Sequence, residues 1–366
     1  MTDKSFIPAA KPIVGDEERE AVDRVLLSGM IAQGPETSRF EEEFSQDALN
    51  GAPGVTVNSG TSALHLGLLA AGIGPGDEVI VPSFTFAATA NSVAATGAKP
   101  VFADIDEYFT LDPKDVETRI TDRTKAIMPV HLYGHPANME GLLGLAQKHD
   151  VLLLEDCAQA HMATWDGKFV GTMGLFGAFS FYPTKNMTSA EGGFVSSKDE
   201  ELLRRVRLYR NQGMEERYRN EVVGYNNRMT DVHAAIGRVQ LKKLPGWTAT
   251  RQKNAEFLST NITGVEVPKV HEKATHVYHQ YTIRVAEDRD GFMQALRDEY
   301  QIGSGVYYPI PNHELESLKH FAEGLVLPET AAAAKECLSL PVHPTLSEDD
   351  LERIVDAVNE LAKAGA

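Results

Sequence analysis

The residue types best suited to chemistry are a lysine and a carboxylate that each follow an apolar run. Lys185 comes just after the run Ala178–Pro183, and Asp156 ends an earlier run that begins at Val151. Burial of a lysine disfavours its ammonium form and leaves a neutral amine that can attack a carbonyl. Such a pair can hold pyridoxal phosphate (PLP), because the amine bonds to the aldehyde and the carboxylate keeps the ring nitrogen protonated. A structural lysine in a salt bridge with a nearby acid is the alternative.

A short polar turn, residues 58–62, joins the apolar segment Val55–Val57 to an Ala- and Leu-rich segment that predicts a helix. A strand that turns through Ser-Gly-Thr into a helix directs free N–H groups and hydroxyls to one spot, where the helix dipole favours an anion. Gly60, Thr61 and Ser62 are therefore candidates for a phosphate site. An ordinary N-cap with no ligand explains the same pattern.

The rest of the chain alternates continuous apolar segments with helical segments. This alternation predicts an α/β fold whose parallel sheet is covered by helices on both faces. Ligands of such sheets bind outside the carboxyl ends of the strands. His131, Asp156, Gln159 and the turn 58–62 all fall at that edge. Phe86 follows another predicted strand and could stack on a flat ring, although a core phenylalanine is the simpler interpretation.

Composition limits the class of partner. The 366 residues indicate about two domains, and a hydrophobic content of 42% with a charged content of 24% is typical of a soluble globular protein. The net charge of −17 at pH 7 argues against nucleic acid or an anionic membrane as the main partner, because both require a basic surface. No signal peptide or membrane-spanning run is found, so we expect a cytoplasmic protein. Cys157 and Cys337 form no CxxC pair, so neither a disulfide nor a metal site is predicted.

A change in composition near Leu244–Trp247 predicts a domain boundary. We expect residues 13–244 to form a larger, PLP-binding domain and residues 245–366 to form a smaller α/β domain. Residues 1–12 are typical of an extended arm, which we expect to pack against the smaller domain.

Taken together, these segments resemble the DegT/DnrJ/EryC1/StrS family of PLP-dependent sugar aminotransferases. The matching stretches occur in the family's order over nearly the whole chain: NSGTSALHLGL, PSFTFAATANSV, MPVHLYG, LLEDCAQAHMA, SFYPTKN, EGGFVSS, GYNNRMTDVHAAIGRVQL and, more loosely, YYPIPNH. The resemblance implies PLP fold type I, which is similar to aspartate aminotransferase and has a large domain with a mostly parallel, seven-stranded sheet. One branch of the family has histidine in place of this lysine and performs deoxygenation, so Lys185 favours transamination.

The resemblance also implies roles for single residues. Lys185 bonds to PLP and moves a proton between the substrate α-carbon and the cofactor, while Asp156 pairs with the ring nitrogen. Gln159 contacts the phenolic oxygen, and Phe86 stacks on the ring. Asn226 reaches the phosphate in a neighbouring subunit, which implies a homodimer with shared active sites. The other phosphate contacts implied are Gly60, Thr61, Ser62 and Ser180.

In this family the amino donor is usually L-glutamate and the acceptor is a nucleotide-linked keto-sugar. The resemblance therefore implies formation of an amino sugar for a surface polysaccharide, a glycan or an antibiotic. The form of GYNNRMTDVHAAIG favours a 4-keto-6-deoxyhexose over a 3-keto sugar. A PLP-binding regulator without turnover and an amino-acid lyase of the same fold remain alternatives. Candidate substrate contacts are His131, Arg228, Tyr308 and His313.

Overall fold

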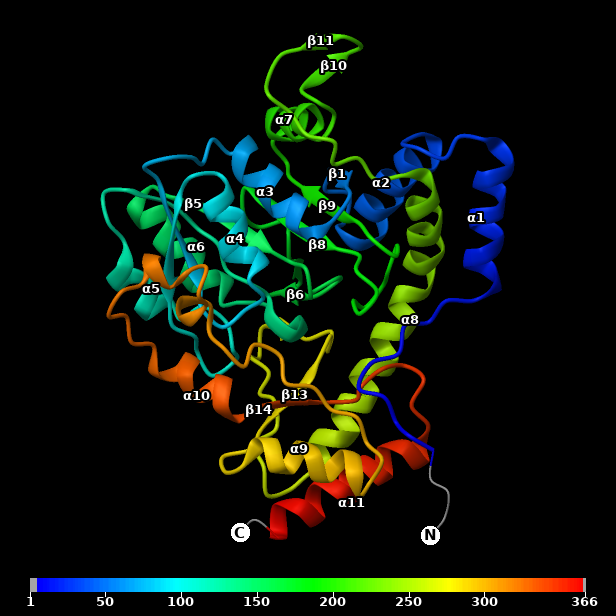
Figure 1. The fold of residues 1–366 in the computed structure, drawn as a ribbon, viewed down its shortest axis with the longest axis vertical. Coiled ribbons are helices and arrows are strands. Elements are labelled where there is room, and N and C mark those ends of the chain that lie inside the picture. Colours follow the sequence, from blue (N-terminus) through cyan, green and yellow to red (C-terminus); the bar gives the residue numbers. More distant parts are fainter. Residues whose placement is uncertain (1–4, 365–366) are drawn as a thin grey trace.

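A seven-stranded sheet forms the centre of the computed structural model, which describes residues 5–364 (Figure 1). In order across the sheet, the strands are β1 (Gly54–Val57), β9 (Gly193–Ser196), β8 (Phe176–Ser180), β5 (Leu152–Asp156), β4 (Thr124–Ile127), β2 (Glu78–Pro82) and β3 (Lys99–Ala103). The strands from β8 to β3 run parallel, and β9 runs antiparallel to both β8 and β1. This arrangement confirms the mostly parallel, seven-stranded sheet expected from the sequence.

Helices cover both faces of the sheet. One face carries α3 (Gly60–Ala70), α4 (Ala88–Ala95) and α7 (Glu200–Arg210). The other carries α2 (Pro35–Ala48), α5 (Pro113–Arg119), α6 (Met139–His149) and the first half of α8 (Asp231–Asn261), with α1 (Asp16–Ser28) outside α8 (Figure 1). On β2, Val79 and Val81 pack toward the first face, whereas Ile80 packs toward the second. Side chains of a strand alternate between faces, so a strand buried on both sides becomes a continuous apolar run.

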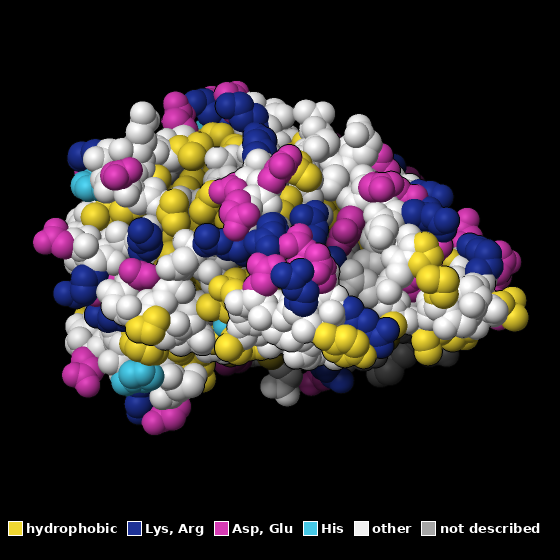
Figure 2. All heavy atoms as spheres, turned by 90° about the horizontal axis from the view of Figure 1, so that it is seen from above, with side chains coloured by type: hydrophobic (Ala, Val, Ile, Leu, Met, Phe, Trp, Pro, Cys, Tyr) yellow, Lys and Arg dark blue, Asp and Glu magenta, His cyan; other side chains and the backbone are white. Residues whose placement is uncertain are grey.

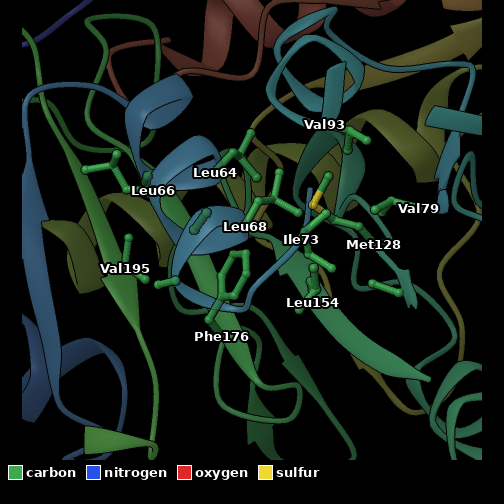
Figure 3. Close-up of a cluster of buried hydrophobic side chains, with 14 of the residues drawn as sticks. Leu64, Leu66, Leu68, Ile73, Val79, Val93, Met128, Leu154, Phe176 and Val195 are labelled. Atoms are coloured by element: carbon green, nitrogen blue, oxygen red, sulfur yellow. The ribbon is translucent and has the colours of Figure 1, made fainter. Parts of the chain in front are cut away.

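The largest buried cluster joins α3 to the sheet. Leu64 and Leu68 of α3 lie over Phe176 of β8 and Val195 of β9 (Figure 3). The approach is close because α3 has a glycine, Gly67, where a Cβ would lie 2.7 Å from the Phe176 ring. Burying each large apolar side chain contributes about 1.5–3 kcal/mol. This packing holds the start of α3 firmly at the carboxyl edge of the sheet.

The C-terminal part has its own core around the antiparallel pair β13 (Tyr281–Arg284) and β14 (Cys337–Leu340). The elements packed on this pair are α9 (Arg289–Asp298), α11 (Glu348–Ala364) and the second half of α8. Ile7 of the N-terminal arm lies in the same core and pairs with Ile302. Helix α8 passes through the predicted boundary at residues 244 and 245, so both parts share this helix. A division of the chain at that point stays a prediction.

The remaining elements are short. They are α10 (Pro328–Glu336), the sheet of β12 (Ala274–Thr275), β6 (Thr164–Trp165) and β7 (Lys168–Phe169), the hairpin of β10 (Met214–Glu216) and β11 (Arg219–Asn220), and the 3-10 turns η1 (Leu132–Gly134), η2 (Asn312–Glu314) and η3 (Lys319–Phe321). The β10–β11 hairpin projects from the end of the molecule opposite α9 and α11 (Figure 1). Seen from that end, acidic and basic side chains are mixed over the surface (Figure 2). No helix within residues 5–364 is long and apolar enough to cross a membrane.

Candidate active site

Lys185 and Asp156 meet at the carboxyl edge of the sheet because they follow neighbouring parallel strands. Asp156 is the last residue of β5 and pairs in register with Ala178 of β8, and the loop after β8 carries Lys185. Burial lowers the pKa of Lys185 to about 8, and the nearby negative charge of Asp156 acts in the opposite direction. A much larger share of this amine is therefore neutral near neutral pH than is usual for lysine, as a nucleophile and proton carrier requires.

The carboxylate of Asp156 is held by two hydrogen bonds. Thr89 Oγ1 donates to Oδ2 at 2.8 Å, and the backbone N–H of Ala158 donates to Oδ1 at 3.1 Å. Burial raises the pKa of Asp156, while these two bonds and the charge of Lys185 lower it. Sequence reasoning missed Thr89, which is the second residue of α4 and lies on its first turn. The position of α4 directly after Phe86, at the same sheet edge, was the signal that could have found it.

The turn before α3 is both a helix cap and a candidate anion site. Ser59 is the N-cap residue, and its Oγ accepts a hydrogen bond from the N–H of Ser62 at 3.1 Å. The N–H groups of Gly60 and Thr61 donate to no acceptor in the described part of the chain, and Thr61 is exposed. A Cβ at Gly60 would lie 2.6 Å from Cβ of Ser180, so this turn packs directly on the end of β8. Free N–H groups at a helix start favour a bound phosphate.

Gln159 and Tyr308 lie together beside Asp156. Gln159 Nε2 donates to the Tyr308 hydroxyl at 2.6 Å, and Gln159 Oε1 accepts from the N–H of Tyr133 at 2.8 Å. Burial raises the pKa of Tyr308, and the charge of Asp156 adds to this effect. Phe86 is 63% exposed, although it is a large apolar ring in a segment otherwise buried. An exposed ring at this edge is available to stack on a flat cofactor.

The loop of Lys185 is attached to the C-terminal part of the chain. Asn186 Nδ2 donates to the carbonyl oxygen of Val277 at 3.0 Å, and Asn186 Oδ1 lies 3.3 Å from Nδ1 of His279. Asn186 is buried, so these polar contacts are shielded from water. They fix the backbone next to the reactive amine.

His131 lies inside the protein rather than at the predicted substrate site. It is fully buried, its Nε2 lies 3.2 Å from Oε2 of Glu155, and its Nδ1 accepts from the N–H of Ala137 at 3.0 Å. Glu155 also accepts hydrogen bonds from three N–H groups of the loop 171–174. Contact with a substrate would require His131 to break both bonds, so we attribute to it a structural role.

Two further substrate candidates, His313 and Arg228, are buried or partly buried and have polar partners within the chain. His313 is buried, with Nδ1 2.6 Å from Oγ of Ser83. Arg228 is partly buried and donates to Oδ1 of Asn211 at 2.9 Å. Asn226 is exposed, and its reach into a neighbouring subunit stays a prediction. The segment 226–228 nevertheless runs beside the phosphate turn of its own chain, because the carbonyl of Asn227 accepts from the N–H of Asn58 at 2.9 Å.

These residues fit PLP. A buried amine lies near a buried carboxylate, a helix start offers N–H groups that no acceptor within residues 5–364 uses, and the Phe86 ring is exposed at the same sheet edge. Lys185 would hold the aldehyde carbon, Asp156 the ring nitrogen, and the turn with Ser180 the phosphate. The fold and the site together define an enzyme that uses PLP.

Comparison with known protein families shows which family of PLP enzymes the chain belongs to. The model of the DegT/DnrJ/EryC1/StrS aminotransferase family matches residues 12–359, so this chain belongs to that family and is a PLP-dependent aminotransferase. Spore coat polysaccharide biosynthesis protein SpsC of Bacillus subtilis is 39% identical, with 98% of this chain and 97% of SpsC covered. The UDP-N-acetyl-3-dehydro-alpha-D-glucosamine 3-aminotransferase of Acidithiobacillus ferrooxidans is 41% identical, with 94% of this chain and 93% of that relative covered.

Two solved structures have the same fold as this chain. DesV of Streptomyces venezuelae superposes with a TM-score of 0.92 at 40% identity, covering 98% of this chain and 99% of DesV. The PLP form of the Streptococcus pneumoniae protein Spr1654 superposes with a TM-score of 0.91 at 28% identity, covering 99% of this chain and all (100%) of Spr1654.

Proposed function

We propose that this aminotransferase moves the amino group of L-glutamate to the ketone of a nucleotide-linked sugar. The observation that carries the proposal is the meeting of a lysine of lowered pKa with a buried carboxylate at the edge where the phosphate turn opens. PLP, when bound, supplies an electron-withdrawing ring that stabilises the negative charge left when the substrate carbon loses a proton. Lys185 would take and return that proton, and Asp156 would keep the ring nitrogen protonated.

The nucleotide sugar is proposed from two relatives whose names refer to sugars. The A. ferrooxidans relative is named for a UDP-linked 3-dehydro sugar, and SpsC for spore coat polysaccharide biosynthesis. We keep the 4-keto-6-deoxyhexose as the proposed acceptor, on the form of the segment 224–237, and treat the 3-keto sugar as the competing outcome. The product would then be an amino sugar for a polysaccharide, a glycan or an antibiotic.

A homodimer with shared sites is the second part of the proposal. Large side chains from the site segments are exposed in the single chain: Phe86 is 63% exposed, Tyr182 48% and Tyr225 38%. Exposed aromatic side chains around a cofactor site are suited to burial by a second subunit. Asn226, next to Tyr225, would then lie where it can enter the partner's site.

The test is a steady-state assay of the purified, PLP-loaded protein. L-glutamate is supplied with a panel of nucleotide-linked 3-keto and 4-keto sugars, and the amino sugar formed is identified by mass spectrometry. The proposal predicts glutamate-dependent amination of a 4-keto sugar. Consumption of an amino acid with no keto-sugar present would indicate a lyase instead, and the absence of any turnover would indicate a regulator.

A further inference from the structure

The side-chain amide of Gln159 is held at both ends by tyrosines from separate segments. Its Oε1 accepts a hydrogen bond from the backbone N–H of Tyr133 at 2.8 Å, and its Nε2 donates to the hydroxyl of Tyr308 at 2.6 Å. A backbone N–H can only donate, so the amide oxygen must face Tyr133 and the amide nitrogen must face Tyr308. The second hydrogen of Nε2 has no acceptor within residues 5–364, so it is free for a ligand.

Both tyrosines have an unusual backbone conformation. The φ angle is 58° at Tyr133 and 63° at Tyr308, which is the left-handed region that bulky residues rarely occupy. Their rings are stacked with centroids 6.2 Å apart, and the buried ring of Phe84 packs edge-on against both. Such a conformation persists only where the surrounding structure enforces it, and it is concentrated at functional sites. The two tyrosines therefore hold the Gln159 amide rigidly.

The held amide lies at the cofactor site. Gln159 is buried and follows Asp156 closely in the chain, at the end of β5. Burial raises the pKa of the Tyr308 hydroxyl, and the charge of Asp156 is close enough to add to that shift. Lys185, Asp156 and the turn before α3 account for the aldehyde, the ring nitrogen and the phosphate of PLP, which leaves its phenolic oxygen. The free N–H of Gln159 is a donor suited to that oxygen.

We infer that Tyr308 is a positioning residue, which directs the free N–H of Gln159 to the phenolic oxygen of PLP, rather than a contact of the sugar substrate. Without the Tyr308 hydroxyl, only the bond to Tyr133 would orient the amide. A hydrogen bond to the phenolic oxygen draws negative charge away from it, so that oxygen attracts the proton of the nearby Lys185–PLP nitrogen less strongly. The inference requires bound PLP but depends on neither the donor nor the acceptor of the proposed function.

The test follows the absorbance of the PLP-loaded protein as the pH is raised, because the Lys185–PLP group changes colour when its nitrogen loses a proton. Tyr308→Phe removes only the hydroxyl, and we expect it to raise the midpoint of this titration by about one pH unit, a tenfold change in the proton equilibrium. Tyr307→Phe is the matched control. The Tyr307 ring lies beside that of Tyr308, with centroids 6.3 Å apart, but its hydroxyl is not a partner of Gln159. Its midpoint should equal that of the wild type.

A double variant shows whether Tyr308 acts through Gln159. Gln159→Ala should raise the midpoint, and adding Tyr308→Phe to it should cause no further change, because the two residues act as one unit. A further rise in the double variant would show that the Tyr308 hydroxyl reaches the cofactor itself, which would overturn the positioning role. An unchanged midpoint in Tyr308→Phe would also overturn it, and a raised KM for the keto-sugar in that variant would then identify Tyr308 as a substrate contact.

Thermal melting and the amount of PLP retained show whether each variant is folded. If Tyr308→Phe does not fold, Gln159→Glu replaces it, because its carboxylate can accept from both tyrosines but has no N–H to donate. The midpoint of Gln159→Glu should rise, and a midpoint equal to that of the wild type would overturn the inference. The titration needs no substrate, so it decides this inference even if no keto-sugar is aminated and the proposed function fails.

Discussion

At the scale of single residues, the chemistry depends on how far water is excluded from Lys185. Burial alone lowers its pKa to about 8 although Asp156 opposes the shift. A fully solvated pair would hold the lysine charged, because an opposite charge favours the ammonium form. Desolvation therefore outweighs the attraction of the Asp156 charge, and the enzyme has a usable amine close to neutral pH.

The lowered pKa predicts how Lys185 reacts with pH. In the protein stripped of PLP, competitive labelling with trace acetic anhydride should show Lys185 becoming reactive with a midpoint near pH 8, as its ammonium loses a proton. The ordinary lysine value is 10.5, so surface lysines should follow more than a pH unit later. Quantitative mass spectrometry of the labelled peptides measures both, and a common midpoint for all lysines would show that Lys185 is solvated.

Thr89 is expected to position the carboxylate of Asp156. Its hydrogen bond favours the ionised carboxylate, so Thr89→Val should raise the pKa of Asp156 and move the acid limb of the pH–rate profile to higher pH. A bond to a charged group is worth about 1.5–3 kcal/mol, which predicts a fall of about tenfold or more in kcat/KM. Thr89→Ser keeps the hydroxyl and serves as the control. Equal pH–rate profiles for Thr89→Val and Thr89→Ser would show that the Thr89 hydroxyl does not position Asp156.

At the scale of elements, the start of α3 must lie against the end of β8. Leu64 and Leu68 press α3 onto the sheet, and glycine at position 60 lets the turn approach Ser180. The same turn caps its own helix through Ser59, and the N–H groups of Gly60 and Thr61 still have no acceptor within residues 5–364. Capping and phosphate binding are therefore compatible here, although they were alternatives in the sequence.

Gly60→Ala tests this close approach. The new Cβ would lie 2.6 Å from Cβ of Ser180, so the turn must shift, and we expect the Kd for PLP to rise about tenfold, a change of roughly 1.4 kcal/mol. Gly144→Ala on α6 is the control, because a Cβ there meets nothing within 4 Å and alanine favours a helix. Fluorescence titration with PLP compares the two. Equal affinities would show that the turn does not hold the phosphate.

At the scale of the whole molecule, the lysine loop is joined to the C-terminal part through Asn186, which donates to the carbonyl oxygen of Val277. A movement of that part would therefore reach the reactive amine.

The proposed dimer makes a prediction for mixed subunits. Lys185→Ala and Asn226→Ala chains should each be nearly inactive, but a hybrid dimer would contain one site with both residues intact. Random exchange should then restore about a quarter of the wild-type activity, because half of the dimers are hybrids with one good site of two. Steady-state rates after co-refolding or co-expression measure this. Recovery of no activity would contradict a shared site.

Much of this architecture could be predicted because strand ends are visible in the sequence. Asp156 and Lys185 follow apolar runs, and the edge of a parallel sheet collects whatever follows its strands. The family's motifs added the cofactor and the order of elements.

The parts that were not predicted depend on side-chain direction and on long-range contacts. The sequence places His131 at the correct edge but does not show that it turns inward to Glu155. Thr89 carries no local motif, and its partner Asp156 lies in a segment distant in the chain. The continuous α8 was missed because Pro245 and Gly246 are typical of a helix end.

The central claim is that Lys185 is the residue that bonds to PLP and that Asp156 holds the ring nitrogen. The most direct measurement is reduction of the PLP-loaded protein with borohydride, followed by peptide mapping with mass spectrometry. The account predicts the cofactor's added mass on Lys185 and no label in Lys185→Ala. A stable label on any other lysine would contradict it.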